Sequence, residues 1–363
     1  MTDNLKKLSD AGVSIWLDDL SRGALTSGAL ASDVETRNVV GVTTNPTIFA
    51  AALAKGEDYA EQFSGLASAG TSLDDAVVAA TTDDVREACD AFTEIYESSG
   101  GFDGRVSIEV DPRLARNTEA TIEAAKMLWE KVDRPNVMIK IPATVEGLPA
   151  ITEVISEGIS VNTTLIFALD QYRAVANAYI DGLELANRKG KDLTTIHSVA
   201  SFFISRIDAE VDRRLDEIGT EEALALKGKV AIANGQLAYQ AYEEIFGSER
   251  FTSLEGANPQ RVLWASTGTK NPEYSKTMYV DQLVAPNVVN TMPAATLAAS
   301  AEELGEFVDV RTQYEAAHQV MDRLAEVGVD FRDVTDKLES EGVEKFEASW
   351  EELLESVRSA LGA

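Results

Sequence analysis

The chain has 363 residues, 45% of them hydrophobic, and 61 acidic against 32 basic side chains give it a formal net charge of −29 at pH 7. Such a charge repels nucleic acid and anionic membranes, so we expect neither as a partner. A single cysteine, Cys89, excludes an internal disulfide, and two histidines, His197 and His318, are too few for a three-imidazole zinc centre. We therefore expect metal-free chemistry that relies on lysine, carboxylates, hydroxyls and amides.

The N-terminus from Met1 to Asp10 is polar, and no apolar run approaches the roughly 20 residues that a membrane-spanning helix needs. This pattern predicts a cytoplasmic protein. The sequence leaves open whether the chain is a monomer or a homodimer.

Eight short runs rich in β-branched residues predict strands, and apolar residues at helical spacing separate them. The predicted strands are Val13 to Leu17, Val39 to Thr43, Val106 to Val110, Val137 to Ile141, Ser160 to Ile166, Thr194 to Val199, Arg261 to Ala265 and Val288 to Asn290. Among the helices between them are Pro112 to Lys131 and Asp170 to Lys189, with Asp111 and Asp170 as N-caps. This alternation predicts an α/β fold, the (β/α)8 TIM barrel, with its active site at the C-terminal ends of the strands.

Two segments are longer than a minimal repeat requires. Ala50 to Gly104, after the second strand, has room for two or three helices, and Glu302 to Ala363 predicts further acidic helices. Neither segment contains a linker rich in proline, glycine and serine. We therefore expect residues 1–363 to form one barrel domain, with a helical insertion at about 50–104 and a C-terminal extension at about 302–363.

Polar side chains recur near the C-terminal ends of the predicted strands. Because side chains alternate along a strand, Val13, Ile15 and Leu17 would face the helices and leave Asp18 inside the barrel. The same rule turns further polar side chains inward: Thr43, Asn45, Glu109, Asn162 and Thr164. Barrel interiors are usually packed with valine, isoleucine and leucine, so this set predicts a reaction centre. Strand parity favours Asp18 only weakly over its neighbour Asp19 as the carboxylate that points into the barrel.

The fourth predicted strand carries one lysine, Lys140, within the apolar run Val137 to Thr144. Alternation points Lys140 into the barrel, where burial lowers the pKa of a lysine and makes its amine a nucleophile for carbonyl groups. A strand-end lysine paired with a carboxylate is the other interpretation, and this segment alone leaves both open. If the amine reacts, Glu109 can shuttle protons, and Asp18 can accept a β-hydroxyl proton as a carbon–carbon bond breaks.

Two later segments are candidates for phosphate binding. Ser201 to Arg206 is expected to begin a helix with Ser201 as N-cap, and a helix N-terminus beside an arginine can bind phosphate. An ordinary cap with a solvated Arg206 explains this segment equally well. Ser266 to Pro272 includes Lys270 but lacks the spacing of a nucleotide-binding phosphate loop. On an acidic surface, a phosphate ester needs specific cations, and Arg206 and Lys270 are the candidates.

Taken in order, these motifs resemble the transaldolase family over about residues 13–300. The similar segments are Gly41 to Phe49, Ser107 to Arg113, the Schiff-base signature Val137 to Ile155, Asn162 to Phe167 and Ser201 to Arg206. The resemblance implies a (β/α)8 barrel without a cofactor in the non-oxidative pentose phosphate pathway. Such an enzyme moves a dihydroxyacetone unit from sedoheptulose 7-phosphate or fructose 6-phosphate to glyceraldehyde 3-phosphate or erythrose 4-phosphate.

The resemblance also implies roles for individual residues. Lys140 would form the Schiff base, Glu109 would act as acid and base through a water held with Thr164, and Asp18 would serve the cleavage step. Asn45 and Asn162 would contact the dihydroxyacetone unit, and Ser201, Arg206 and Lys270 would hold phosphate. Thr43 and Phe203 would complete the substrate-binding set. Better-known branches of the family have an arginine in a shorter segment where this chain has Ser266 to Asn271.

Two alternative functions remain. A fructose 6-phosphate aldolase would release free dihydroxyacetone, but those relatives carry glutamine at the position of Glu109 and tyrosine near Phe203, so the residues here favour transfer. A non-catalytic sugar-phosphate-binding barrel would have lost Lys140, Asp18 or Glu109, and all three are present.

Overall fold

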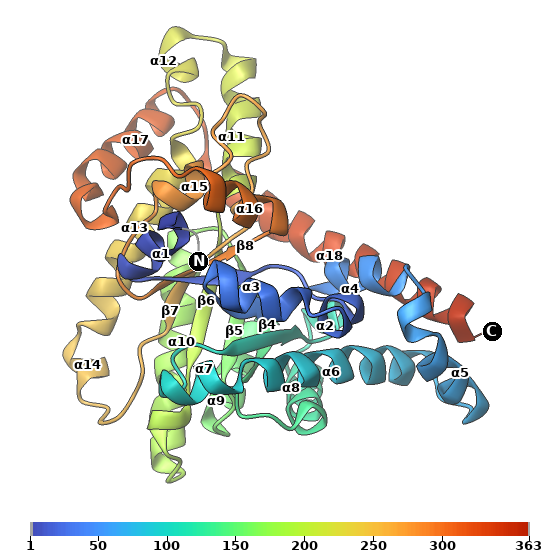
Figure 1. Cartoon of the computed structure of the whole chain (residues 1–363). Helices are drawn as coiled ribbons and strands as arrows, with labels where there is room; N and C mark the ends of the chain where they lie inside the picture. The colour runs from blue at the N-terminus through green and yellow to red at the C-terminus, as the bar shows by residue number, and fades with distance from the viewer. Residues whose placement is uncertain (1–2, 362–363) are drawn as a thin grey trace.

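The computed structural model describes residues 3–361, in which eight parallel strands close into a barrel in chain order. The strands are β1 Val13–Leu17, β2 Val39–Thr43, β3 Arg105–Glu109, β4 Val137–Pro142, β5 Val161–Ile166, β6 Ser198–Phe203, β7 Arg261–Ala265 and β8 Val288–Met292. β8 pairs back with β1, with Ser14 opposite Val289. The (β/α)8 barrel expected from the sequence is confirmed (Figure 1).

Helices surround this barrel as the alternating pattern predicts. Up to β6 they are α1 Asp3–Asp10, α2 Arg22–Thr26, α3 Ala29–Arg37, α4 Pro46–Leu53, α5 Ala60–Ser68, α6 Leu73–Ala91, α7 Thr93–Ser98, α8 Thr118–Val132, α9 Gly147–Ser156 and α10 Leu169–Arg188. After β6 they are α11 Ser205–Ile218, α12 Glu221–Leu224, α13 Val230–Phe246, α14 Glu249–Thr252, α15 Met278–Asp281, α16 Ala294–Glu302, α17 Tyr314–Glu326 and α18 Phe331–Leu361. Four 3-10 turns complete the elements: η1 Glu57–Tyr59, η2 Pro112–Leu114, η3 Leu193–Thr195 and η4 Val310–Thr312.

Both long segments contain helices. The insertion after β2 holds α5, α6 and α7, and the C-terminal extension holds α17 and the 31-residue α18. One large hydrophobic cluster runs from Leu5 to Val357 and includes Cys89, which is fully buried in α6. Hence the insertion and the extension pack onto the same core as the barrel. No helix among residues 3–361 has the length and apolar character to cross a membrane.

The prediction for the sixth strand was wrong by four residues. Residues 194–199 begin in the turn η3, because the Asp192 carboxylate accepts hydrogen bonds from the backbone nitrogen of Thr194 at 3.0 Å and from its hydroxyl at 2.7 Å. The strand starts at Ser198 instead, and a run with one β-branched residue forms it because its neighbours β5 and β7 supply the pairing. Ser201 therefore lies in β6 and is not an N-cap, and the next helix starts at Ser205.

Two predicted helix starts were also displaced. Asp111 caps only the turn η2, by accepting from the backbone nitrogen of Arg113 at 2.9 Å, and α8 begins later, at Thr118, with Asn117 as its N-cap. Asp170 lies in the first turn of α10, where its charge favours the helix dipole, and it is not the cap. The N-cap position belongs to Ala168, which has no capping side chain.

Large side chains fill the N-terminal half of the barrel. Trp16 is fully buried, and its ring occupies the space where a Cβ on Gly41 would lie, only 2.7 Å away, so β2 requires glycine there. Asp103, just before β3, accepts from the Trp16 indole at 3.3 Å and from the Ser14 hydroxyl at 2.8 Å, and it pairs with Arg261 at 3.1 Å. These side chains close the N-terminal end of the barrel, which we call the plugged end. It lies opposite the strand ends where the polar residues gather.

His197 precedes β6 at this plugged end and gives the protein a pH-dependent stability. Burial, with the positive charges of Arg105 and Arg261, lowers the pKa of His197 to about 3, whereas an unfolded chain takes up this proton near pH 6.5. Stability is therefore lost as the pH falls below about 6.5. Between pH 7.5 and 5 this loss amounts to about 2 kcal/mol.

We expect His197→Gln to remove this part of the acid sensitivity, since glutamine does not titrate. Urea unfolding at pH 7.5 and pH 5.0 measures the loss for each protein. The wild type should lose about 2 kcal/mol more than the variant over this interval. Equal losses would show that His197 does not resist protonation in the folded state.

Candidate active site

A cavity of about 240 Å³ opens at the C-terminal ends of the strands. Nine of the eleven residues proposed from the sequence line it: Asp18, Thr43, Asn45, Lys140, Thr164, Ser201, Phe203, Arg206 and Lys270. They come from the four strands β2, β4, β5 and β6 and from the segments that follow β1, β2, β6 and β7. The two others, Glu109 and Asn162, lie in the wall of the barrel and contact residues that line the cavity.

Lys140 and Glu109 form a buried ion pair between neighbouring strands. They are register partners on β4 and β3, and the ammonium nitrogen lies 3.1 Å from a carboxylate oxygen. The side chains are only 6% and 2% exposed. Lys140 also donates to the backbone oxygen of Thr44 at 2.9 Å. Burial raises the pKa of Glu109 against the opposing charge of Lys140, so the carboxylate is poised to take up and return a proton.

Asp18 lies across the cavity in a short chain of hydroxyl groups. The Thr43 hydroxyl donates to its carboxylate at 2.7 Å and lies 2.6 Å from the hydroxyl of Thr291 on β8. Burial raises the pKa of Asp18, and the positive charge of Lys140 opposes the rise. Asp19 is exposed and does not line the cavity. The geometry thus favours Asp18 over Asp19 as a group that can reach a substrate.

An irregularity at the end of β5 surrounds Thr164. The register with β6 shifts between Thr163 and Ile166, and Leu165 has a left-handed backbone with φ of 62°. Such a bulge redirects side chains and is common beside active sites. Thr164 is fully buried, and its hydroxyl has no hydrogen-bond partner among residues 3–361. Within the cavity wall, this hydroxyl is therefore free to bind a substrate oxygen or a water.

Asn162 cross-links three strands below the cavity. Its amide nitrogen donates to the Ser107 hydroxyl on β3 at 3.0 Å, and its amide oxygen accepts from the Ser201 hydroxyl on β6 at 2.7 Å. It is fully buried and sits opposite Lys140 in the strand register. Asn162 thus orients Ser201, whose side chain does line the cavity.

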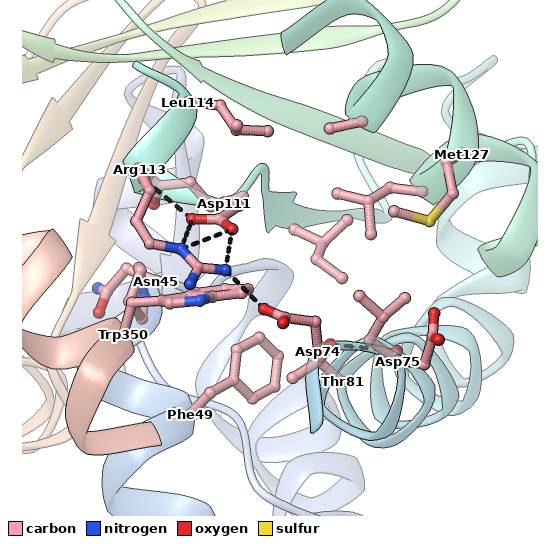
Figure 2. Close-up of a pocket in the computed structure, with 16 residues that line it drawn as sticks. Asn45, Phe49, Asp74, Asp75, Thr81, Asp111, Arg113, Leu114, Met127 and Trp350 are labelled. Atoms are coloured by element: carbon pink, nitrogen blue, oxygen red, sulfur yellow. Dashed lines mark hydrogen bonds and ion pairs between the residues drawn. The ribbon is translucent and has the colours of Figure 1, made fainter. Parts of the chain in front are cut away.

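Asn45 lines both the candidate catalytic cavity at the strand ends and a second, mostly apolar cavity of about 290 Å³. Its side-chain oxygen caps α4 by accepting from the backbone nitrogen of Ile48 at 3.0 Å, which leaves the amide nitrogen available for a substrate oxygen. Glu109 also borders the second cavity, among side chains of α6 and α8 and the ring of Trp350 (Figure 2). This apolar surrounding explains why burial raises the pKa of Glu109.

Arg206, Lys270 and Lys345 gather at the mouth of the catalytic cavity. The Arg206 guanidinium lies 5.0 Å from the centre of the Phe203 ring, and burial lowers its pKa. The Lys270 side chain reaches solvent, yet burial among neighbouring atoms, with the charges of Arg206 and Lys345, lowers its pKa. The mouth therefore favours an anionic group.

Sequence reasoning missed the residues that the C-terminal helix brings to the site. Lys345 and Phe346 of α18 line the cavity, and the Phe346 ring centre lies 6.0 Å from the Lys140 nitrogen. Their local pattern resembles any amphipathic helix, so no signal marked them. Thr291 was also missed, although a threonine near the end of an apolar strand follows the rule that identified Thr43 and Thr164.

The arrangement combines a buried amine, two carboxylates with raised pKa values and a cationic rim. An amine beside a proton-accepting carboxylate can add to a ketone, and the rim can hold a phosphate ester. Within residues 3–361, histidine, cysteine, aspartate and glutamate side chains nowhere gather in threes as a metal site requires.

Comparisons with known proteins agree with this chemistry. A family model described as transaldolase/fructose-6-phosphate aldolase matches residues 15–357. A transaldolase of Kocuria rhizophila is 60% identical, and one of Thermobifida fusca is 58% identical, each over 100% of both chains. A transaldolase of Mycolicibacterium smegmatis is 58% identical over 99% of this chain and 98% of its own.

Proposed function

This chain belongs to the transaldolase/fructose-6-phosphate aldolase family, and we propose that its transaldolase activity proceeds through a Schiff base on Lys140. The observation that carries the proposal is the position of the amine. Its nitrogen lies 3.1 Å from Glu109, and Lys140 lines a cavity whose mouth is cationic. A ketose phosphate with its phosphate at the mouth directs its carbonyl carbon toward this nitrogen.

In the first step, the neutral Lys140 amine adds to the C2 ketone of fructose 6-phosphate or sedoheptulose 7-phosphate. Transfer of the ammonium proton to Glu109 produces this neutral amine, and the raised pKa of Glu109 favours the transfer. Loss of the C2 oxygen as water then gives the iminium ion. Glu109 returns the proton to the leaving hydroxyl, and the unpartnered Thr164 hydroxyl is suited to hold a bridging water.

In the second step, Asp18 accepts the proton of the C4 hydroxyl as the C3–C4 bond breaks. The bonding electrons flow into the iminium group and form an enamine on Lys140, while an aldose phosphate leaves. The reverse sequence adds the three-carbon enamine to the aldehyde of glyceraldehyde 3-phosphate or erythrose 4-phosphate. The hydrogen bond from Thr43 supports this role because it orients the carboxylate of Asp18.

Glu109 and Phe203 support transfer over release of free dihydroxyacetone. Release requires water to protonate and hydrolyse the enamine before an acceptor arrives. Phe203 is 6% exposed and presents an apolar ring, packed against Phe167 at 5.2 Å between ring centres, where a tyrosine would place a hydroxyl. The wall therefore offers no acid group at this position to protonate the enamine.

We expect borohydride reduction with fructose 6-phosphate to attach a three-carbon unit to Lys140, because this lysine faces the cavity beside a proton acceptor. Peptide mass spectrometry identifies the modified residue. Lys140→Arg should form no adduct, since its guanidinium does not lose a proton at neutral pH. Modification of a different lysine, or an active Lys140→Arg variant, contradicts the assignment.

Asp18→Asn should still form the Schiff base but stall before cleavage, because an amide cannot accept the hydroxyl proton. The adduct trapped on Lys140 should then retain the whole phosphohexose, and kcat should fall by about 100-fold or more, as expected for loss of a general base. Intact-protein mass spectrometry distinguishes this adduct from the three-carbon unit.

Glu109→Gln provides the matched control, because it removes the other carboxylate. It should slow formation and hydrolysis of the imine while leaving the trapped species a three-carbon unit. If Asp18→Asn gives only the three-carbon adduct at the wild-type rate, Asp18 is not the cleavage base.

A further inference from the structure

The C-terminal helix α18 crosses the mouth of the barrel. It packs against α11 near its N-terminal end and against α4, α5 and α6 farther along, and Figure 1 shows it in red beside α4. Its buried residues recur at helical spacing: Val334, Thr335, Leu338, Gly342, Val343, Phe346, Ser349, Trp350, Leu353, Leu354 and Val357. The face that carries Phe346 is thereby turned toward the catalytic cavity.

Contacts on either side of Lys345 set the rotation of this helix. Before it, Glu339 accepts a hydrogen bond from the Gln171 side chain at 3.1 Å. After it, the Ser349 hydroxyl lies 2.8 Å from that of Thr47 at the start of α4. Gly342 permits the close approach, because a Cβ there would lie 3.0 Å from Leu165. Lys345 is therefore held at the cavity mouth by specific contacts.

A further contact joins α18 to the loop after β3. Trp350 packs 5.8 Å from the Arg113 guanidinium, which also pairs with Asp111 at 2.6 Å and Asp74 at 2.5 Å (Figure 2). This loop follows directly from Glu109 at the end of β3. The helix that carries Lys345 is thus connected to the strand that carries the proposed proton shuttle.

The charges around Lys345 point to an anionic ligand. Arg206, Lys270 and Lys345 line both the catalytic cavity and a hollow outside it, so the three cations stand at the boundary between the two. Within residues 3–361, no carboxylate lies within 4.0 Å of any of them. Two carboxylates border the outer hollow, Glu341 and Glu210. Glu341 lies 3.7 Å from Lys337, and Glu210 is already paired with Arg213, Arg214 and Lys337. The three like charges repel one another, and an anion bound among them relieves this repulsion.

We propose that Lys345 is a third phosphate-binding residue of the site, supplied by the C-terminal helix, and that it determines specificity for phosphorylated acceptors. The inference rests on the proposed function, since it assigns the ligand of the same cavity. Arg206 can bind two phosphate oxygens at once, whereas Lys270 and Lys345 act as point charges on the remaining oxygens. Donor and acceptor phosphates occupy this position in turn, so Lys345 contributes to both half-reactions.

The test compares Lys345→Met, which keeps the length of the side chain and removes its charge, with Lys337→Met on the same helix. Lys337 lines neither cavity, and its ammonium pairs with Glu210 at 2.9 Å. Two quantities are measured: the competitive inhibition constant of inorganic phosphate, and the ratio of kcat/KM for glyceraldehyde 3-phosphate to that for unphosphorylated glyceraldehyde.

In Lys345→Met, the inhibition constant should rise about 10-fold and the acceptor ratio should fall about 10-fold, as expected for loss of one charge-assisted contact. The kcat/KM for glyceraldehyde should fall far less than that for glyceraldehyde 3-phosphate. Lys345→Arg should restore most of the phosphate preference, and Lys337→Met should match the wild type. Because Lys345 is exposed, Lys345→Met and Lys345→Arg should unfold at the wild-type temperature.

The inference is wrong if Lys345→Met keeps the wild-type inhibition constant and acceptor ratio. It is also wrong if phosphorylated and unphosphorylated acceptors lose activity equally, because a structural role of Lys345 would affect both alike. Borohydride trapping of Lys140 in the wild type tests the proposed function separately. A trapped wild type with an unchanged Lys345→Met therefore overturns this inference alone.

Discussion

The buried pair of Lys140 and Glu109 is the constraint on which the rest of the structure depends. Removing two opposite charges from water is costly, and their attraction offsets this cost only when the geometry is close. Adjacent parallel strands supply that geometry, because Glu109 and Lys140 are register partners across β3 and β4. The barrel must then keep water away from both sides of the pair. Trp16 and its neighbours fill the space below, and Phe346 covers the lysine from above.

Two residues at the rim of the site have a disfavoured backbone conformation. Leu165 and Ser266 have left-handed backbones with φ of 62° and 56°, at the ends of β5 and β7, where residues other than glycine are disfavoured. The first lies beside the unpartnered hydroxyl of Thr164, and the second lines the catalytic cavity. A left-handed backbone and an unsatisfied hydroxyl group thus lie side by side at the C-terminal end of β5, at Leu165 and Thr164.

Strand periodicity was sufficient to predict the fold and many of the residues that line the candidate cavity, because parity decides which strand residues point into a barrel. That rule identified Asp18, Thr43 and Lys140 before any coordinates were known. It did not locate β6, because the run from Ser198 has few β-branched residues and forms a strand through its neighbours. The rule could not identify Lys345, because this lysine lies on a charged helix and not on a strand. Only the packing of that helix across the barrel brings Lys345 to the cavity. Local sequence patterns therefore predict the strands of the barrel well. They predict poorly which residues long-range packing brings to the cavity.

The shared position of Arg206, Lys270 and Lys345 between the catalytic cavity and the outer hollow has a consequence for the order of events. The proposed nucleophile, Lys140, lies at the bottom of the cavity, and the three cations lie at its mouth. A ketose phosphate must therefore enter with its carbonyl end first. After cleavage, the three-carbon fragment stays bonded at the bottom, and the aldose phosphate already has its charged end facing outward. It can depart, and the next aldose phosphate can arrive, through the same opening. The bottom of the cavity thus holds the three-carbon fragment, which stays bonded, and the open end of the cavity faces the aldose phosphate, which is exchanged.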